Sequence, residues 1–180
     1  LSPFYCDNRK TLAYPKVRSF VKDQLAALIR EQYPEATAIA GVATGAIAQG
    51  ALVADALNLP MCYVRAKAKD HGMGNLIEGT LPEGAKVVVV EDLISTGGSS
   101  LKAVEALRAA GFEILGMVAS FTYGFPVAEE AFRAANVTLT TLTNYEAVVE
   151  TARAIGYIEE SHLPLLARWR ANPSTWSPEV

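Results

Sequence analysis

The sequence predicts an α/β fold in which a central, mostly parallel sheet is flanked by helices. Short apolar segments alternate with longer segments of helical spacing along the chain, as in repeated strand and helix units. Four consecutive valines, at positions 87 to 90, suit a strand that is buried on both faces. The chain has 180 residues, of which 51% are hydrophobic and 19% are charged. We therefore expect a single domain over residues 1–180.

The individual elements follow from apolar spacing and from proline and glycine residues. Pro15 suits the first turn of a helix, and Pro34 ends that helix. Gly111 ends the helix that follows the valine strand. Threonine alternates with apolar residues over residues 137–142, which predicts a strand at the sheet edge. In chain order we expect helix 15–34, strand 37–42, helix 46–57, strand 61–65, the valine strand, a helix over 101–110, strand 114–121, helix 125–135, strand 137–142, and helices 145–155 and 159–170.

The strongest functional pattern begins directly after the four valines. Glu91 and Asp92 lie at the end of that strand, where open α/β sheets bind ligands, and their carboxylates could contact sugar hydroxyls or a hydrated Mg²⁺. Residues 95–99, with the sequence STGGS, then supply hydroxyls and backbone N–H groups at a helix N-terminus, which suits a phosphate. The alternative is an ordinary turn in which Ser99 or Ser100 caps the helix and the acidic pair is solvated.

Two further loops could contact a phosphorylated ligand. Thr44 and Gly45 follow the predicted strand 37–42 and could hold a diphosphate through backbone N–H groups, although a helix-entry turn explains them equally well. Residues 65–79 contain lysines, an arginine, a histidine and several glycines but little apolar spacing, so we expect a mobile surface loop. The cations of this loop suit a lid over a polyanionic substrate, and the alternative is a solvated basic hairpin.

Composition and charge argue against several classes of protein. The net charge of −3 provides no general surface for polyanions, so we expect no nucleic-acid partner. No apolar run approaches about 20 residues, so we expect no membrane span. Cys6 and Cys62 lack the spacing of a metal site or a disulfide framework, which favours a reducing cytoplasm. Because the chain begins at Leu1 and not at methionine, a truncation before residues 1–15 is left open.

Three motifs resemble a known family. The run VEDLISTGGSS, residues 90–100, resembles the 5-phosphoribosyl 1-diphosphate (PRPP) binding motif of the type I phosphoribosyltransferases. The KDHG of the basic loop and the opening SPFYCDNR narrow the resemblance to the orotate phosphoribosyltransferases. This resemblance implies a type I phosphoribosyltransferase fold and Mg²⁺-dependent transfer of the phosphoribosyl group from PRPP to orotate. It also implies a homodimer in which loop 65–79 reaches the neighbouring active site.

The resemblance implies a role for each matching residue. Glu91 and Asp92 would bind the ribose hydroxyls, directly or through Mg²⁺-bound water, and Thr44 and Gly45 would hold the diphosphate. The 5′-phosphate would be bound by Ser95, Thr96, Gly97, Gly98 and Ser99. The diphosphate would also contact Arg65, Lys67, Lys69 and His71. The catalytic residues would be Lys69, His71 and Asp92. The base would be bound by the N-terminal segment 1–15, through Phe4, Tyr5 and Arg9, and by Tyr123.

Three positions depart from the family pattern. Ala66 stands where many members have a lysine, and Lys67 could replace that cation. Gly45 also stands in place of a lysine, which leaves backbone N–H groups as the donors there. Tyr123 aligns with an arginine that binds the carboxylate of orotate in many members, so Arg9 or a residue before Leu1 would take that role. A phosphoribosyltransferase for a purine or another base, and a non-catalytic PRPP-binding regulator, are the alternatives.

Overall fold

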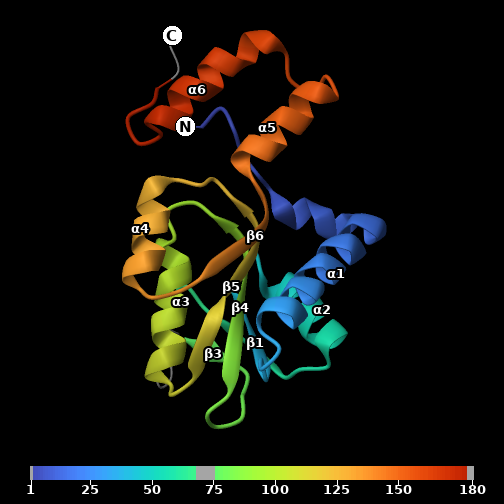
Figure 1. Cartoon of the computed structure of the whole chain (residues 1–180), viewed down its shortest axis with the longest axis vertical. Coiled ribbons are helices and arrows are strands. Elements are labelled where there is room, and N and C mark those ends of the chain that lie inside the picture. The colour runs from blue at the N-terminus through green and yellow to red at the C-terminus, as the bar shows by residue number, and fades with distance from the viewer. Residues whose placement is uncertain (1, 68–75, 178–180) are drawn as a thin grey trace. The chain divides into compact units, whose positions relative to one another are not determined.

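The computed structural model describes residues 2–67 and 76–177 (Figure 1). The chain divides into two compact units. The larger unit is Asn8–Asn144, and the smaller unit combines Leu1–Asp7 with Tyr145–Val180. The single domain expected over residues 1–180 stays a prediction. No helix in the described ranges has the length and apolar character that crossing a lipid bilayer requires.

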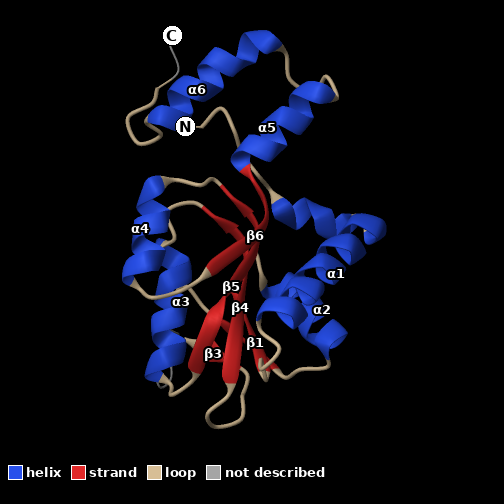
Figure 2. Cartoon of the chain, in the orientation of Figure 1, coloured by secondary structure: helices blue, strands red, loops and turns tan. Residues whose placement is uncertain are grey.

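The larger unit is built on a six-stranded sheet with the strand order β3-β2-β1-β4-β5-β6 (Figure 2). Neighbouring strands are parallel except for β2 and β3, which pair antiparallel. The predicted α/β class with a mostly parallel sheet is confirmed, and β6 lies at the sheet edge as predicted. The strands are Ala38–Val42 (β1), Met61–Val64 (β2), Ile77–Glu78 (β3), Lys86–Ile94 (β4), Glu113–Thr122 (β5) and Leu139–Asn144 (β6). The helical elements of this unit are Asn8–Ala13 (η1), Pro15–Gln32 (α1), Ile47–Leu57 (α2), Gly98–Ala109 (α3) and Pro126–Ala134 (α4).

Helices cover both faces of the sheet (Figure 1). Val87 and Val89 of β4 belong to a core cluster that includes side chains of α3 and α4. Val88 and Val90 belong to a second cluster, which includes side chains of α1 and α2. All of these valines are fully buried. Alternate residues of a strand point to opposite faces, so a strand covered on both sides requires an uninterrupted apolar run.

Two of the differences from the sequence-based expectation concern strands next to the candidate site. Ile77 and Glu78, which the sequence assigned to loop 65–79, form the short strand β3. They pair with Val64 and Tyr63 of β2, and this long-range pairing leaves no local periodicity in a segment of two residues. The second difference is the length of β4, which continues to Ile94 and therefore contains the acidic pair.

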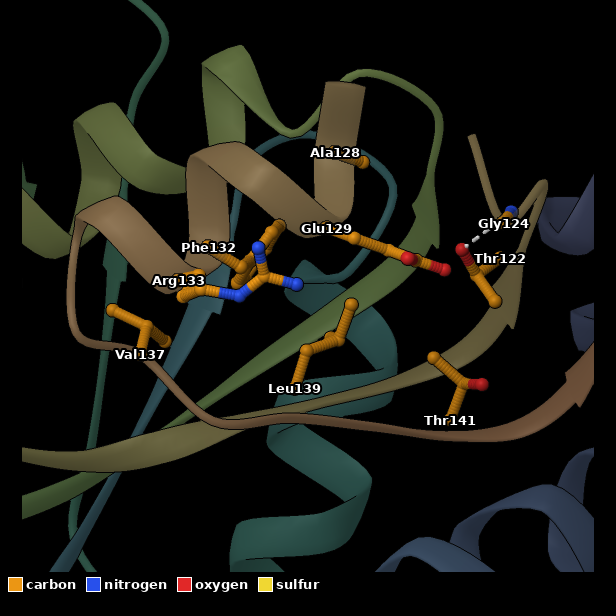
Figure 3. A pocket seen from close by; sticks show the side chains of 9 residues that line it. All are labelled: Thr122, Gly124, Ala128, Glu129, Phe132, Arg133, Val137, Leu139 and Thr141. Carbon is orange, nitrogen blue, oxygen red and sulfur yellow. Dashed lines mark hydrogen bonds between the residues drawn. The ribbon is translucent and has the colours of Figure 1, made fainter. Parts of the chain in front are cut away.

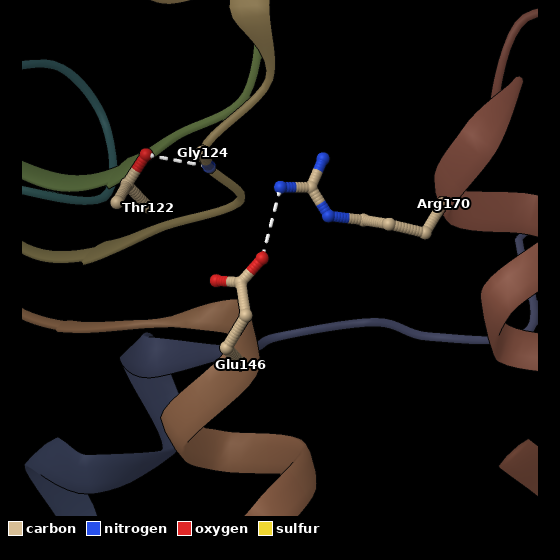
Figure 4. A network of polar contacts seen from close by, with 4 residues as sticks. All are labelled: Thr122, Gly124, Glu146 and Arg170. Atoms are coloured by element: carbon tan, nitrogen blue, oxygen red, sulfur yellow. Dashed lines mark hydrogen bonds and ion pairs between the residues drawn. The ribbon is translucent and has the colours of Figure 1, made fainter.

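The smaller unit is helical, and aromatic packing organises it. Its elements are Tyr145–Ala154 (α5), Glu160–His162 (η2) and Leu163–Ala171 (α6). The ring of Phe4 lies 5.0 Å from that of Tyr145 in an edge contact and stacks on Trp169 at 6.2 Å. Arg170 pairs with Glu146 over 3.1 Å (Figure 4), and its guanidinium lies 5.3 Å from the centroid of the Tyr145 ring. These contacts attach the segment around Phe4 to both long helices of this unit.

Candidate active site

Glu91 and Asp92 leave β4 on opposite faces of the sheet. Side chains alternate along a strand, so Glu91 shares the face of Val89, which α3 covers. Asp92 shares the face of Val90, which α1 and α2 cover. The two carboxylates are neighbours in the sequence, but they have separate environments.

Glu91 is buried beneath the first turn of α3. Its Oε2 accepts a hydrogen bond from the Ser100 hydroxyl over 2.8 Å, and its Oε1 accepts one from the backbone N–H of Asp92 over 2.9 Å. Burial raises the pKa of Glu91 to about 8, although both hydrogen bonds act to lower it. The alternative of a solvated acidic pair is therefore wrong for Glu91, whose side chain is withdrawn from water.

Asp92 borders a small cavity on the other face of the sheet. Its Oδ1 accepts a hydrogen bond from the backbone N–H of Leu93 over 2.7 Å, and its backbone carbonyl accepts one from Asn8 Nδ2 over 2.7 Å. Gly45 lies against the carboxylate, because a Cβ atom at position 45 would overlap the Asp92 side chain. The glycine at this position therefore allows the loop after β1 to close onto Asp92. Thr44, which precedes it, is exposed.

The Ser/Thr/Gly loop links β4 to the N-terminus of α3. Gly97 precedes the helix with a φ of +80°, and a Cβ atom there would lie 2.8 Å from the Phe132 ring. Among the described residues no side chain caps α3, since Ser100 donates to Glu91 instead. The alternative in which Ser99 or Ser100 caps this helix is therefore wrong. The first N–H groups of α3 keep their capacity to bind an anion.

Arg65 brings the basic segment next to this loop. Its Nη1 pairs with Glu78 of β3 over 3.3 Å. Arg65 also lines a cavity of about 670 Å³ together with Gly98 and Ser99. Lys102 lines the same cavity and was missed from the sequence, although it follows the Ser/Thr/Gly loop by about one helical turn. Cations and the start of α3 therefore meet at one surface.

The rest of the predicted basic loop is described only in part. Lys67 is exposed. Lys69 and His71 lie outside the described residues. Their proposed contacts with a diphosphate stay predictions.

Tyr123 was predicted to contact the base, and the structure places its ring in a row of buried aromatic side chains. The ring meets Phe121 edge-on at 5.0 Å and stacks on Phe125 at 5.5 Å. Only 7% of Tyr123 is exposed. A base could reach little of this ring unless the row rearranged, so the role of Tyr123 stays a prediction.

The N-terminal base candidates lie in different units of the chain. Arg9 belongs to η1 in the larger unit and lines the cavity that Asp92 borders. Phe4 and Tyr5 belong to the smaller unit, where Phe4 packs on Tyr145 and Tyr5 is exposed. Contacts of these three residues with a base stay predictions.

Several residues around Asp92 were absent from the sequence-based assignment. Asn8, Gln49 and Ser120 line the same cavity as Asp92. Gln49 interrupts the apolar stretch that forms α2. A polar side chain on the buried side of a helix is unusual, and this signal could have marked Gln49 as a site residue. The contact from Asn8 links segments far apart in the sequence, so no local pattern could have predicted it.

Another cavity, of about 360 Å³, lies between α4 and the strands β5 and β6 (Figure 3). Glu129 and Arg133 of α4 line it together with Leu139 of β6. The Thr122 hydroxyl accepts a hydrogen bond from the Gly124 N–H over 3.0 Å at its edge. Its lining contains none of the residues that the sequence assigned to a site.

Comparison with known proteins identifies the family. A family model described as phosphoribosyl transferase domain matches residues 17–154. Orotate phosphoribosyltransferase of Bacteroides fragilis is 66% identical over 175 residues, which cover 97% of this chain and 82% of that protein. The chain belongs to the orotate phosphoribosyltransferase family. The Bacillus subtilis orotate phosphoribosyltransferase is 54% identical over 175 residues, covering 97% of this chain and 81% of that protein.

The fold comparison agrees with this family. The crystal structure of orotate phosphoribosyltransferase from Aeropyrum pernix matches with a TM-score of 0.77 and 30% identity, over 88% of this chain and 86% of that chain. The resemblance to the orotate phosphoribosyltransferases and the type I phosphoribosyltransferase fold predicted from the sequence are thus confirmed. The predicted enzyme class, a glycosyltransferase that moves a pentosyl group, is confirmed with them.

Proposed function

We propose that this chain transfers the 5-phosphoribosyl group of PRPP to N1 of orotate, giving orotidine 5′-monophosphate and diphosphate. The reaction would serve pyrimidine nucleotide synthesis. The observation that carries the proposal is the acidic pair of β4 joined to the uncapped N-terminus of α3 in a member of this family. A phosphorylated ribose needs acceptors for its hydroxyls and donors for its phosphate, and this strand, loop and helix unit supplies both.

The two ends of the phosphoribosyl group have separate binding groups in this proposal. The proposed ribose ligands are Asp92, which is the more exposed of the pair, and Glu91, whose two oxygens accept hydrogen bonds from Ser100 and the Asp92 N–H in the ligand-free chain. The 5′-phosphate accepts hydrogen bonds from the loop and the first turn of α3. The proposed phosphate ligands are Ser95, Thr96, Gly97, Gly98 and Ser99.

The acidic pair also fits Mg²⁺. Within the described part of the chain, no group of three or more His, Cys, Asp or Glu side chains could hold a metal ion. Mg²⁺ is commonly bound by one or two carboxylates together with substrate oxygens and water. Asp92 is the proposed carboxylate ligand, directly or through water, and the buried Glu91 would act only through a bound water. When bound, the ion would neutralise negative charge on the diphosphate.

Departure of the diphosphate requires positive charge and exclusion of water. The bond from C1 of the ribose to the diphosphate breaks as N1 of orotate bonds to that carbon, and the proton of N1 is released to water or to the departing diphosphate. Negative charge accumulates on the departing diphosphate, which cations stabilise. The proposed diphosphate ligands are Thr44, Gly45, Arg65, Lys67, Lys69 and His71. Closure of loop 65–79 would also keep water from the reacting carbon.

The proposal includes a homodimer and a location in the cytoplasm. In the dimer, loop 65–79 of one subunit would close over the active site of its partner. Neither Cys6 nor Cys62 forms a disulfide bond, which is consistent with a reducing compartment. Neither nucleic acid nor a membrane is a proposed partner.

A single assay tests the reaction. Loss of orotate is followed at its ultraviolet band with PRPP and Mg²⁺ present, and the assay is repeated with hypoxanthine, adenine and uracil. We expect turnover with orotate alone. Turnover with another base and none with orotate would instead support a phosphoribosyltransferase of different specificity. PRPP binding without turnover of any base would support a regulator.

A further inference from the structure

A buried amide beside the active site has no hydrogen-bond partner among the described residues. Gln49 lies in the first turn of α2, and only 6% of it is exposed. Its side-chain nitrogen, Nε2, makes no hydrogen bond with the described part of the chain. Burial of an amide without a partner lowers stability, whereas an apolar residue at the same place would not. The unpartnered amide therefore points to an acceptor that binds in the cavity that Gln49 lines.

That space is a cavity shared with the proposed ribose carboxylate. Gln49, Asp92, Gly45 and Ser120 line a cavity of about 10 Å³. A volume of this size is close to that needed for one water molecule, and a buried water needs several polar partners. The lining provides an amide donor, a carboxylate acceptor and the Ser120 hydroxyl.

The two oxygens of the Asp92 carboxylate have different surroundings. Its Oδ1 accepts the backbone N–H of Leu93, while Oδ2 is the carboxylate oxygen that a Cβ atom at position 45 would overlap most. Gly45 has no side chain to offer a donor. Gln49 is one helical turn further along the same segment, and it brings a donor to this face of the sheet.

We propose that Gln49 is a positioning residue for Asp92. One water molecule in the cavity accepts a hydrogen bond from Gln49 Nε2 and donates one to the Asp92 carboxylate. This bridge satisfies the buried amide and restricts the orientation of the carboxylate before substrate binds. The inference rests on the proposed role of Asp92 in binding the ribose of PRPP.

The test uses Gln49→Met, which removes the donor while nearly preserving the length of the side chain. PRPP affinity is measured by calorimetry with Mg²⁺ present, and kcat and KM are measured for both substrates. We expect PRPP affinity to fall about tenfold, the lower end of the loss typical when a partner that orients a ligand group is removed. The KM for orotate should change little. Gln24→Leu, on the exposed side of α1, is the control and should retain wild-type affinity.

A double-mutant cycle separates positioning from general stability. If Gln49 acts through Asp92, the Gln49→Met change should cost no further PRPP affinity in an Asp92→Asn background. Additive losses would overturn the inference. Unchanged affinity of Asp92→Asn alone would overturn the proposed ribose site and this inference with it. If Asp92→Asn lowers PRPP affinity and Gln49→Met does not, the inference about Gln49 is overturned while the proposed ribose site stands.

A crystal structure of the wild-type chain tests the bridge independently of any variant. We expect an ordered water within hydrogen-bond distance of both Gln49 Nε2 and the Asp92 carboxylate. A dry cavity at a resolution that shows other buried waters would overturn the proposal.

Discussion

The Ser100 hydroxyl donates a hydrogen bond to the Glu91 carboxylate over 2.8 Å, which joins the first turn of α3 to the strand that carries the acidic pair. Both side chains are buried. The proposed phosphate donors and the proposed ribose acceptors therefore belong to one rigid strand and helix unit. A hydrogen bond in such a buried place is strong, because no water competes for either partner.

The raised pKa of Glu91 predicts a pH-dependent stability. The folded-state pKa is about 8 against an ordinary value of 4.5, so the folded chain holds a proton that the unfolded chain loses between these values. This contribution to stability is complete below pH 4.5 and is lost as the pH rises through 8. Glu91→Gln removes this ionisation, so its free energy of unfolding should fall less steeply with rising pH than that of the wild type. Between pH 5 and 9 the two slopes should differ by at most about 1.4 kcal/mol per pH unit.

Urea unfolding of the ligand-free chain at several pH values measures this difference. Glu113→Gln is a matched control, because Glu113 is an exposed glutamate on β5. It should retain the wild-type slope. Identical slopes for wild type and Glu91→Gln would show that Glu91 ionises normally in the folded chain.

Gly45→Ala should disturb Asp92. The added Cβ atom would overlap the Asp92 carboxylate, so one of the two must move. We expect a loss of about 1–3 kcal/mol in the free energy of unfolding, as for other overpacked sites, together with weaker PRPP binding. The double variant with Asp92→Ala removes the carboxylate and should recover most of that stability. A Gly45→Ala cost that is the same in both backgrounds would mean that the strain lies elsewhere.

Gly116→Ala should destabilise the sheet through Tyr33. A Cβ atom at position 116 of β5 would overlap the hydroxyl of Tyr33, whose side chain is buried. The expected loss in the free energy of unfolding is about 1–3 kcal/mol. Gly98→Ala is the control, since its Cβ atom would lie 4.0 Å from the nearest heavy atom, Thr96 Oγ1. Chemical unfolding compares the two, and equal losses would contradict the assignment of the cost to Tyr33.

Cys62 should resist thiol reagents in the folded chain. Burial raises the pKa of its thiol to about 11, so little of the reactive thiolate exists at neutral pH. In a Cys6→Ser background, labelling of Cys62 with a coloured disulfide reagent at pH 8 should proceed no faster than unfolding. Addition of urea should make the reaction fast. Fast labelling without urea would show that β2 opens readily in the native state.

Lys69→Ala tests the proposed role of the basic loop in catalysis. Because Lys69 is proposed to stabilise the departing diphosphate, kcat should fall far more than PRPP affinity. Lys16→Ala, an exposed change on α1, serves as the control. Equal losses in kcat and affinity would mean that the lysine stabilises the bound substrate and the transition state alike.

Mixing two inactive variants tests the shared active site. Lys69→Ala supplies an intact Asp92, and Asp92→Ala supplies an intact loop. If the loop reaches the partner subunit, mixed dimers contain one site with both groups, and activity should return after subunit exchange. Absence of activity in mixed dimers, whose formation is checked with differently tagged subunits, would contradict loop sharing.

Much of the fold could be predicted because it depends on local patterns. The four valines indicated a strand covered on both faces, and both core clusters contain them. Pro15 marked the start of α1, which begins at that residue. The strand β3 could not be predicted in this way, since its two residues depend on pairing with β2.

The candidate site could be predicted in composition but not in geometry. The sequence identified Glu91, Asp92 and the Ser/Thr/Gly loop, which are contiguous. The sequence predicted one shared environment for the two carboxylates. In the structure, side chains alternate along the strand, so Glu91 is buried against Ser100 and Asp92 borders a cavity on the other face. The Asn8 contact and the place of Gln49 in the cavity were missed because both residues come from segments distant from Asp92.

The amino-acid sequence alone determined the α/β class, the family motifs and the order of the chemical groups around the valine strand. These features depend on periodicity and on neighbouring residues, which are local properties of the chain. Only the tertiary structure decided that Glu91 is buried against α3 and that Gly45 closes onto Asp92. It also decided that Gln49 faces the same cavity as Asp92. Burial, and with it the pKa of a carboxyl group and the cost of an unpartnered amide, depends on segments that meet only when the sheet and its helices pack.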